Sequence, residues 1–180
     1  SNIYIDGDND YRGLFGMNSG TIKNLSVDGN INGKDYVGGI CGRNENGKVI
    51  NCKNFSDITS KGEHIGGITG RNNSKGIIIS CSNNAEIKGN KYVGGITGLS
   101  NGGPIYRSFN VGNISGVYQV GGITGYSAAE TKVENCYNVG NIIGTNTGIG
   151  GIVGLSADGA IVSKSYNYSS VQGSDAYGMI

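Results

Sequence analysis

The chain has 180 residues, 35 of them glycine, and its 14 Lys and Arg against 13 Asp and Glu give a formal charge of +1. This balance excludes the basic field that draws a protein to nucleic acids or anionic membrane surfaces. The single proline, Pro104, excludes a collagen-like chain, and no apolar run approaches the ~20 residues that span a bilayer.

The first ten residues are interpreted as a lead-in that precedes a repetitive region. Asp6, Asp8 and Asp10 alternate with other residues, an arrangement that suits a hard cation such as calcium. The rest of an EF-hand loop is missing, because Tyr11 stands at the place of the turn glycine and Met17 at the place of the bidentate glutamate. An exposed turn without a metal is therefore the main interpretation, and calcium is the alternative.

After the lead-in, one phrase recurs about every 28 residues. Its double glycine begins at positions 38, 66, 94, 121 and 150, which are 28, 28, 27 and 29 residues apart. A fixed period of this length is typical of a stacked repeat protein, in which each unit packs on its neighbours. We expect a lead-in at 1–10, whose first two residues look like a cloning remnant, and a single solenoid domain over 11–180. The expected units are 11–35, 36–63, 64–91, 92–118, 119–147 and 148–176, with the start of a further rung at 177–180.

Alignment of the units exposes three columns of mostly β-branched residues, separated by Gly, Asn or Ser. The first column is Val37, Ile65, Val93, Val120, Ile149 and Tyr177; the second is Val49 or Ile50, Ile78, Ile105, Val133, and Ile161 or Val162; the third is Ile31, Ile58, Ile87, Ile114, Ile142 and Val171. No segment has helical spacing. The predicted fold is therefore all-β: a parallel β-helix, or β-solenoid, of about six rungs with three short strands each. We expect a right-handed coil by the twist rule for parallel crossovers.

A column of asparagines marks one corner of each unit. Stacked amides can hydrogen-bond to one another and to the turning backbone. The column comprises Asn54, Asn83, Asn110, Asn138 and Asn167.

The direction of one isoleucine column is open from the sequence. Val37 and Ile40 are three residues apart, so a regular strand cannot direct both inward. Either the glycine pair forms a bulge that turns the second residue into the core, which we favour, or the column is an outward apolar stripe that could dock a partner. The column comprises Ile40, Ile68, Ile96, Ile123 and Ile152.

The repeated phrase resembles the GLUG motif. The resemblance rests on Val-Gly-Gly-Ile-Thr-Gly followed by Val133-Glu-Asn-Cys-Tyr-Asn-Val-Gly-Asn-Ile142, and it covers residues 11–180. It is weaker in the first unit, where an arginine replaces one glycine in Tyr11-Arg-Gly-Leu-Phe-Gly16. The resemblance implies an extracellular module of bacterial surface and secreted proteins, such as IgA-peptidase-like and adhesin-like proteins. It brings no catalytic residues.

The four cysteines do not form a zinc pattern, because no Cys-x-x-Cys spacing occurs and His64 lies in another column. Cys52, Cys81 and Cys136 share one column, and only the first two lie in adjacent units. We interpret them as reduced core residues. A disulfide between Cys52 and Cys81 is left open.

Catalysis has little support in the sequence. His64 shares its column with Tyr36, Tyr92 and Gln119 and is interpreted as structural, and no arrangement of His with Asp recurs in the repeat. A glycan-cleaving enzyme would need carboxylates converging from neighbouring rungs. Asp57 and Glu86 are the nearest such pair, but Asn113 and Asn141 follow them in later units, which favours a polar outer ladder.

Aromatic residues form a candidate ligand face. Phe109, Tyr137 and Tyr166 fall in one column on the outward side of their strand, and Tyr106 and Tyr168 enlarge the patch. Such rings often only cover neighbouring aliphatic stems, but they can also form a platform for sugar or protein.

We predict a non-catalytic structural or adhesion module of a larger bacterial cell-surface or secreted protein. It presents solenoid faces to a host protein or glycan, or acts as a spacer, and it is located outside the cell. Any export signal would lie outside this segment. A β-helical glycan-processing enzyme, a lyase or glycosidase, is the alternative. We expect no cofactor, no nucleic-acid partner and no membrane insertion by this segment, and we expect end-to-end self-association through exposed strand edges.

Overall fold

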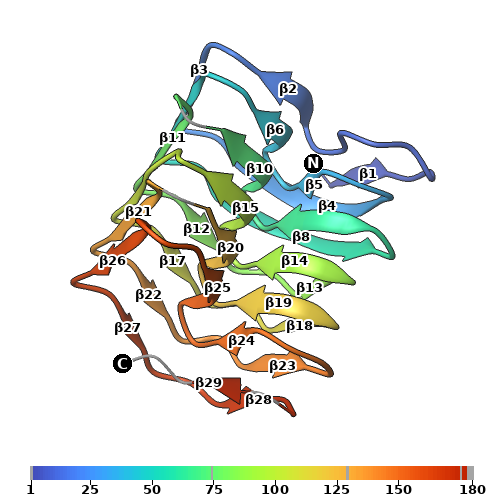
Figure 1. Cartoon of the computed structure of the whole chain (residues 1–180). Coiled ribbons are helices and arrows are strands. Elements are labelled where there is room, and N and C mark those ends of the chain that lie inside the picture. Colours follow the sequence, from blue (N-terminus) through green and yellow to red (C-terminus); the bar gives the residue numbers. More distant parts are fainter. Residues whose placement is uncertain (1, 74, 129, 175, 178–180) are drawn as a thin grey trace.

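The computed structural model describes residues 2–73, 75–128, 130–174 and 176–177, and it is a β-solenoid of about six turns (Figure 1). The paired strands are parallel, each bonded to its equivalents one turn before and one turn after. No helix in this part of the chain is long and apolar enough to cross a membrane. The predicted all-β solenoid with a period of about 28 residues is confirmed.

Each turn passes through four sheets instead of the predicted three. We number the sheets in the order in which one turn enters them. Sheet 1 consists of β5 (Val37–Gly38), β9 (Glu63–Gly66), β14 (Lys91–Gly94), β19 (Tyr118–Gly121), β24 (Ile149–Gly150) and β29 (Ala176–Tyr177). Sheet 2 consists of β2 (Phe15–Asn18), β6 (Cys41–Asn44), β10 (Thr69–Asn73), β15 (Thr97–Asn101), β20 (Thr124–Ser127) and β25 (Val153–Ser156).

The other two sheets complete the turn. Sheet 3 consists of β3 (Thr21–Lys23), β7 (Lys48–Ile50), β11 (Ile77–Ile79), β16 (Ile105–Tyr106), β21 (Lys132–Glu134) and β26 (Ile161–Ser163). Sheet 4 begins with β1 (Ile3–Ile5), β4 (Ser26–Gly33) and β8 (Lys53–Ser60), after which each long strand is replaced by two short ones. These pairs are β12 (Ser82–Asn83) with β13 (Ile87–Lys88), β17 (Phe109–Asn110) with β18 (Ile114–Gly116), β22 (Tyr137–Asn138) with β23 (Ile142–Gly144), and β27 (Tyr166–Asn167) with β28 (Val171–Gln172).

The extra sheet arises at the double glycine. The sequence interpretation treated the whole glycine phrase as one bulged strand, whereas the chain ends β5 at Gly38, turns, and starts β6 at Cys41. Val37 therefore lies on β5 and Ile40 in the bend just before β6, and both are fully buried. The whole Ile40 column is buried, with at most 2% of any member exposed. The inward direction that we favoured is confirmed, and the apolar stripe does not exist.

The solenoid encloses two apolar cores on either side of a narrow waist. One core lies between sheets 2 and 3 and the first half of sheet 4, and it contains the Ile40 and Val49 columns. The other lies between sheet 1 and the second half of sheet 4, and it contains the Val37 and Ile58 columns. At the waist Gly39 meets the side chain of Asn54 so closely that an added Cβ would overlap the amide.

The registers confirm the predicted columns with one exception. Val49 rather than Ile50 is the inward partner of Ile78, and Ile58 pairs with Ile87. At the far end, Ile149 pairs with Ala176, so Tyr177 is one place beyond the column in which the sequence alignment put it. Residues 178–180 of the expected further rung lie outside the described residues.

Candidate functional site

The aromatic side chains of sheet 4 lie in one stacked row on its outer surface. Strands β17, β22 and β27 pair in register, with Phe109 beside Tyr137 and Tyr137 beside Tyr166. The asparagine that follows each ring points into the waist, so alternation along the strand directs the ring outward. The ring centroids are 4.8 Å and 5.4 Å apart, with interplanar angles of 1° and 8°.

A second exposed row runs beside the first. Val111, Val139 and Tyr168 come two residues after the stacked rings and are 44%, 39% and 83% exposed. Sequence reasoning named Tyr168 but missed the two valines, although their offset of two residues from the ring column placed them on the same side. We call the six residues of both rows the aromatic face; its members are Phe109, Tyr137, Tyr166, Val111, Val139 and Tyr168.

Tyr106 does not belong to the aromatic face. It ends β16 in sheet 3, where it pairs with Ile79 and Glu134. Arg107 follows it with a φ of 46°, a left-handed conformation that turns the chain from sheet 3 toward sheet 4. The structure therefore brings four of the five predicted face residues together and places the fifth across a corner.

The stacking limits how the aromatic face can bind. Each ring of the row covers the flat face of its neighbour, so the ring edges and the Tyr137 and Tyr166 hydroxyls are what the row offers to a ligand. Partial burial, with a smaller effect of Tyr166, raises the pKa of Tyr137. The hydroxyl is therefore protonated at neutral pH and can donate as well as accept a hydrogen bond. A ligand would lie along the two rows rather than stack on one ring.

A second aromatic row lies at the entrance to sheet 1. Tyr11, Tyr36 and His64 stack with centroid distances of 4.8 and 4.6 Å, and the Tyr92 ring lies 5.1 Å beyond His64 with a tilt of 34°. All four adopt φ between 53° and 66°, which is uncommon for side chains of this size. The sequence showed the column but not its left-handed backbone, because φ above zero at residues of this size has no reliable signal in the sequence.

His64 is held neutral within this row. Its burial, together with the positive charge of Arg71, lowers the pKa of His64 from 6.5 to about 4. Its Nδ1 atom is buried without a hydrogen-bond partner. A ring that lies between two tyrosines and stays uncharged near neutral pH fits the structural role that the sequence analysis gave it.

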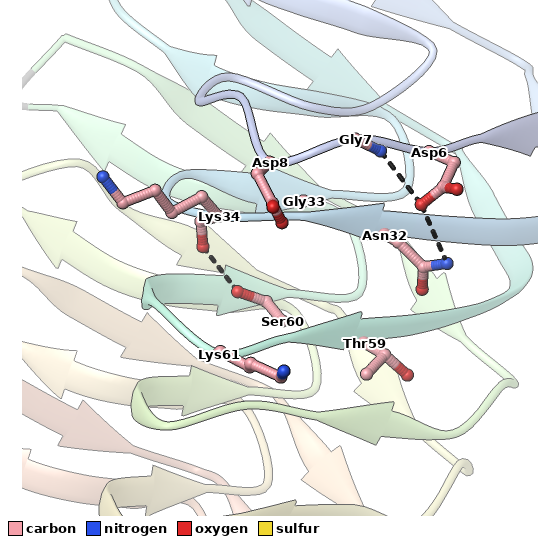
Figure 2. A pocket seen from close by; sticks show the side chains of 9 residues that line it. All are labelled: Asp6, Gly7, Asp8, Asn32, Gly33, Lys34, Thr59, Ser60 and Lys61. Carbon is pink, nitrogen blue, oxygen red and sulfur yellow. Dashed lines mark hydrogen bonds between the residues drawn. The ribbon is translucent and has the colours of Figure 1, made fainter.

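Asp6 and Asp8 line a small pocket at the N-terminal end of the solenoid, where the lead-in crosses the ends of β4 and β8 (Figure 2). The pocket has a volume of about 300 Å³, and Lys34 and Lys61 also line it. Asp6 Oδ1 accepts hydrogen bonds from the Gly7 amide at 2.9 Å and from Asn32 Nδ2 at 3.4 Å. This carboxylate is therefore already engaged in shaping its own loop.

Asp10 does not line this pocket. Within the described part of the chain, no group of three or more His, Cys, Asp or Glu side chains converges on a position for a metal ion. The structure brings Asp6 and Asp8 together with two lysines rather than with Asp10. Calcium binding by the three aspartates stays a prediction.

Asp57 and Glu86, the carboxylate pair considered for glycan cleavage, lie on adjacent turns. Asp57 Oδ1 accepts a hydrogen bond from the Glu86 amide at 2.9 Å. Glu86 Oε2 lies 2.8 Å from Lys88 Nζ. Both carboxylates thus have contacts within the outer surface of sheet 4, as expected of a polar ladder.

All four cysteines are free thiols and are buried. Cys52, Cys81 and Cys136 lie in the core beside the Val49 column, and Cys41 lies at the start of β6. Burial raises the pKa of Cys41 to about 12 and that of Cys136 to about 11. The interpretation of the cysteines as core residues is confirmed.

The fold and the ladders define a parallel β-solenoid repeat protein. The family model described as the GLUG motif matches residues 35–59 and 116–143. The chain therefore contains GLUG repeats in these two regions. No curated protein and no solved structure matches it.

Proposed function

We propose that this chain is a non-catalytic structural and adhesion module of a larger bacterial cell-surface or secreted protein. The solenoid would act as a rigid support whose outer surface contacts a host protein or a matrix glycan, and as a spacer between other domains. The extracellular and bacterial part of the proposal rests on the resemblance to GLUG proteins. The ligand-binding part rests on the aromatic face.

The exposure of the aromatic face is the observation that carries the ligand-binding part. Tyr168 and Tyr166 are 83% and 55% exposed, and two valines lie beside them. Contiguous exposed apolar surface on a soluble protein marks interaction sites, and tyrosine is enriched where such sites bind tightly. Because the rows are fixed by strand pairing, a ligand would not have to order them on binding.

The contacts that the outer carboxylates make favour a non-catalytic module rather than a glycan-processing enzyme. A glycosidase needs two carboxyl groups that face a substrate across about 5 to 10 Å. Asp57 instead accepts a backbone amide of the next turn, and Glu86 pairs with a lysine. Direct assays of the chain against plant and bacterial polysaccharides would test the alternative.

The ligand-binding part can be tested with the isolated chain on arrays of glycans and extracellular-matrix proteins. We expect binding to one ligand class, and we expect the double variant Val139→Ser with Tyr168→Ser to bind it at least about tenfold more weakly, since hot-spot residues commonly cost more than 1 kcal/mol on truncation. Surface plasmon resonance would measure the dissociation constants.

Ile161→Ser is the matched control, because Ile161 is 51% exposed on sheet 3 and not on the aromatic face. It should bind like the unaltered chain. Equal loss in both variants would contradict a site on the aromatic face. If no ligand binds at all, the spacer role alone would remain.

An antibody against the chain should label intact cells of the source organism, and labelling only after permeabilisation would contradict the extracellular part.

End-to-end association is a further part of the proposal. At the C-terminal end, β25 to β28 each pair on one side only among the described residues. The free backbone N–H and C=O groups of an unpaired strand edge can form hydrogen bonds with a strand of another chain. Light scattering over a range of protein concentrations should show a rising mean mass, and a constant monomer mass would contradict this part.

A further inference from the structure

Two of the buried thiols lie directly above one another in the solenoid. Lys53 of β8 pairs in register with Ser82 of β12, and Cys52 and Cys81 are the residues immediately before them. The Ser82 amide donates to the carbonyl oxygen of Cys52 at 3.0 Å. In-register parallel strands lie ~4.8 Å apart, within the Cα separation of ~4.4 to 6.8 Å that disulfides span.

The thiols also point to the same part of the core. Cys52 Sγ lies 3.4 Å from the carbonyl oxygen of Ile50, and Cys81 Sγ lies 3.4 Å from that of Ile79, the equivalent residue one turn later. Cys81 Sγ additionally lies 3.5 Å from the carbonyl oxygen of Val49, which belongs to the same turn as Cys52. Cys52 Sγ likewise lies 3.9 Å from the carbonyl oxygen of Ile22, so each thiol leans toward the preceding turn. For Cys81 the preceding turn is the one that carries Cys52.

Neither of the other two cysteines lies in register with a second thiol, although Cys52 is near enough to Cys41 to add to the rise in its pKa. Cys136 occupies the same column but lies between Ser108 and Ser165, and its amide donates to Ser165 Oγ at 3.1 Å. Cys41 lies on sheet 2, on another wall of the core. The column thus places two thiols, and only two, on adjacent turns.

We propose that Cys52 and Cys81 are a disulfide site, which closes when the chain folds in the presence of an oxidised small-molecule disulfide such as oxidised glutathione. One cysteine thiolate attacks a sulfur of the oxidant, forms a mixed disulfide and releases one reduced thiol. The second cysteine thiolate then attacks the protein sulfur of the mixed disulfide, which forms the Sγ–Sγ bond and releases the second reduced thiol. Two electrons pass to the oxidant, and the two protons of the cysteines end on the released thiols.

In the folded chain the two thiols interact with each other. The hydrogen bond from Cys81 lowers the pKa of Cys52 to about 7, and the same contact raises the pKa of Cys81. The thiolate is the reactive form in disulfide exchange, and either cysteine can make the first attack while both are still accessible during folding. The bond would add a covalent crosslink between two consecutive turns of the solenoid. This site does not depend on the proposed ligand or on the aromatic face.

The test is oxidative refolding of the full chain. The reduced, unfolded chain is refolded in a mixture of reduced and oxidised glutathione, free thiols are alkylated, and peptides are mapped by mass spectrometry. We expect a peptide that links Cys52 to Cys81, with Cys41 and Cys136 alkylated. The oxidised chain should melt about 5 to 10 °C above the reduced chain, because a crosslink over a loop of this length restricts the unfolded state.

Two serine variants provide the controls, since Ser108 and Ser165 show that the column accepts serine. Cys81→Ser should abolish the linked peptide and the rise in melting temperature, whereas Cys136→Ser should retain both. In Cys52→Ser combined with Ser108→Cys, the new thiol at position 108 should link to Cys81 or Cys136.

The proposal is overturned if Cys52 and Cys81 both remain alkylated after oxidative refolding. It is equally overturned if Cys41 or Cys136 is found in linked peptides as often as the proposed pair. The peptide map of the unaltered chain decides between these outcomes even if a variant fails to fold.

Discussion

The asparagine side chains at the waist hold each turn in register with the next. Asn110 Nδ2 donates to Asn138 Oδ1 at 2.7 Å, and its own Oδ1 accepts from Asn83 Nδ2 at 2.7 Å. Asn110 Nδ2 also donates to the carbonyl oxygen of Gly112 at 2.7 Å. These amides are fully buried, and burying them is tolerable because each finds partners. The sequence analysis predicted this ladder, since identical amides that recur at the repeat period come to lie above one another when the turns stack in register.

A second amide ladder in sheet 2 was not predicted. Asn18 donates to Asn44 and Asn44 to Asn72, each at 2.8 Å, and Asn72 reaches Ser100 Oγ at 3.3 Å. These residues fall within the segment after the double glycine that the sequence analysis did not recognise as a separate strand. The column also changes from asparagine to serine halfway along the chain, so it is less evident in an alignment.

At the residue scale, His64 should make stability depend on pH. Its pKa is about 4 in the folded chain and 6.5 ordinarily, so the unfolded chain binds more protons between these values. The contribution of His64 to folding stability is therefore fully present above about pH 6.5, and it is lost as the pH is lowered toward 4. Melting temperatures measured by circular dichroism from pH 7.5 to 4.5 should show this loss.

The variant His64→Tyr tests the assignment, because Tyr36 and Tyr92 occupy the same column on the neighbouring turns. It should melt with a weaker dependence on pH over this interval, while the carboxylates common to both proteins contribute equally. An identical pH dependence in the two proteins would show that His64 is not the group responsible.

At the scale of the element, the glycine corner is the point where sequence reasoning was least complete. It recognised that Val37 and Ile40 conflict with simple alternation, but it could not distinguish a bulge within one strand from a corner between two. The difference depends on how closely Gly39 approaches Asn54 across the waist, and this long-range contact leaves no mark on local spacing. The four-sheet cross-section could therefore not be predicted from the sequence and was recognised only in the structure.

Gly95→Ala should disrupt this corner. An added Cβ would overlap the Gly122 carbonyl oxygen and lie 2.5 Å from Cγ of Asn110, so backbone and ladder would both have to move. We expect a loss of about 3 kcal/mol in the free energy of unfolding, measured by urea titration.

Gly20→Ala is the control for this prediction. The nearest atom to its added Cβ is Asn18 Oδ1 at 4.0 Å, so there is room for the methyl group. Its stability should stay close to that of the unaltered chain. A Gly95→Ala protein of unchanged stability would mean that the waist is wider than the structure shows.

The candidate site was predicted less completely than the fold. The ring column of the aromatic face could be predicted because its residues recur at the repeat period. Tyr106 was misplaced because a left-handed residue, Arg107, changes the direction of the chain immediately after it. Left-handed φ at arginine has no reliable signal in the sequence, since glycine and asparagine are the residues that favour it.

At the scale of the whole molecule, the turns should unfold together. Ile114 is fully buried between Ile87 and Ile142 of the neighbouring turns. Ile114→Asp places an unpaired charge in that core and should cost about 4 kcal/mol or more, with neighbouring turns lost at the same urea concentration. Circular dichroism and tyrosine fluorescence should report one shifted transition.

Ile143→Asp is the matched variant, because Ile143 adjoins the same column but is 48% exposed. It should change stability by no more than about 0.5 kcal/mol. If Ile114→Asp had the milder effect of the two, the inner and outer sides of sheet 4 would be reversed.

The direction of the strand pairing also determines how the module would respond to force. The backbone hydrogen bonds between turns run along the rod, and successive turns follow one another from one end to the other (Figure 1). Tension applied to the two ends therefore loads the bonds of the last turn first, and that turn peels away while the others stay intact. Each peeled turn of about 28 residues would release roughly 90 Å of extended chain. A stalk built from such turns would lengthen stepwise under load instead of breaking at once.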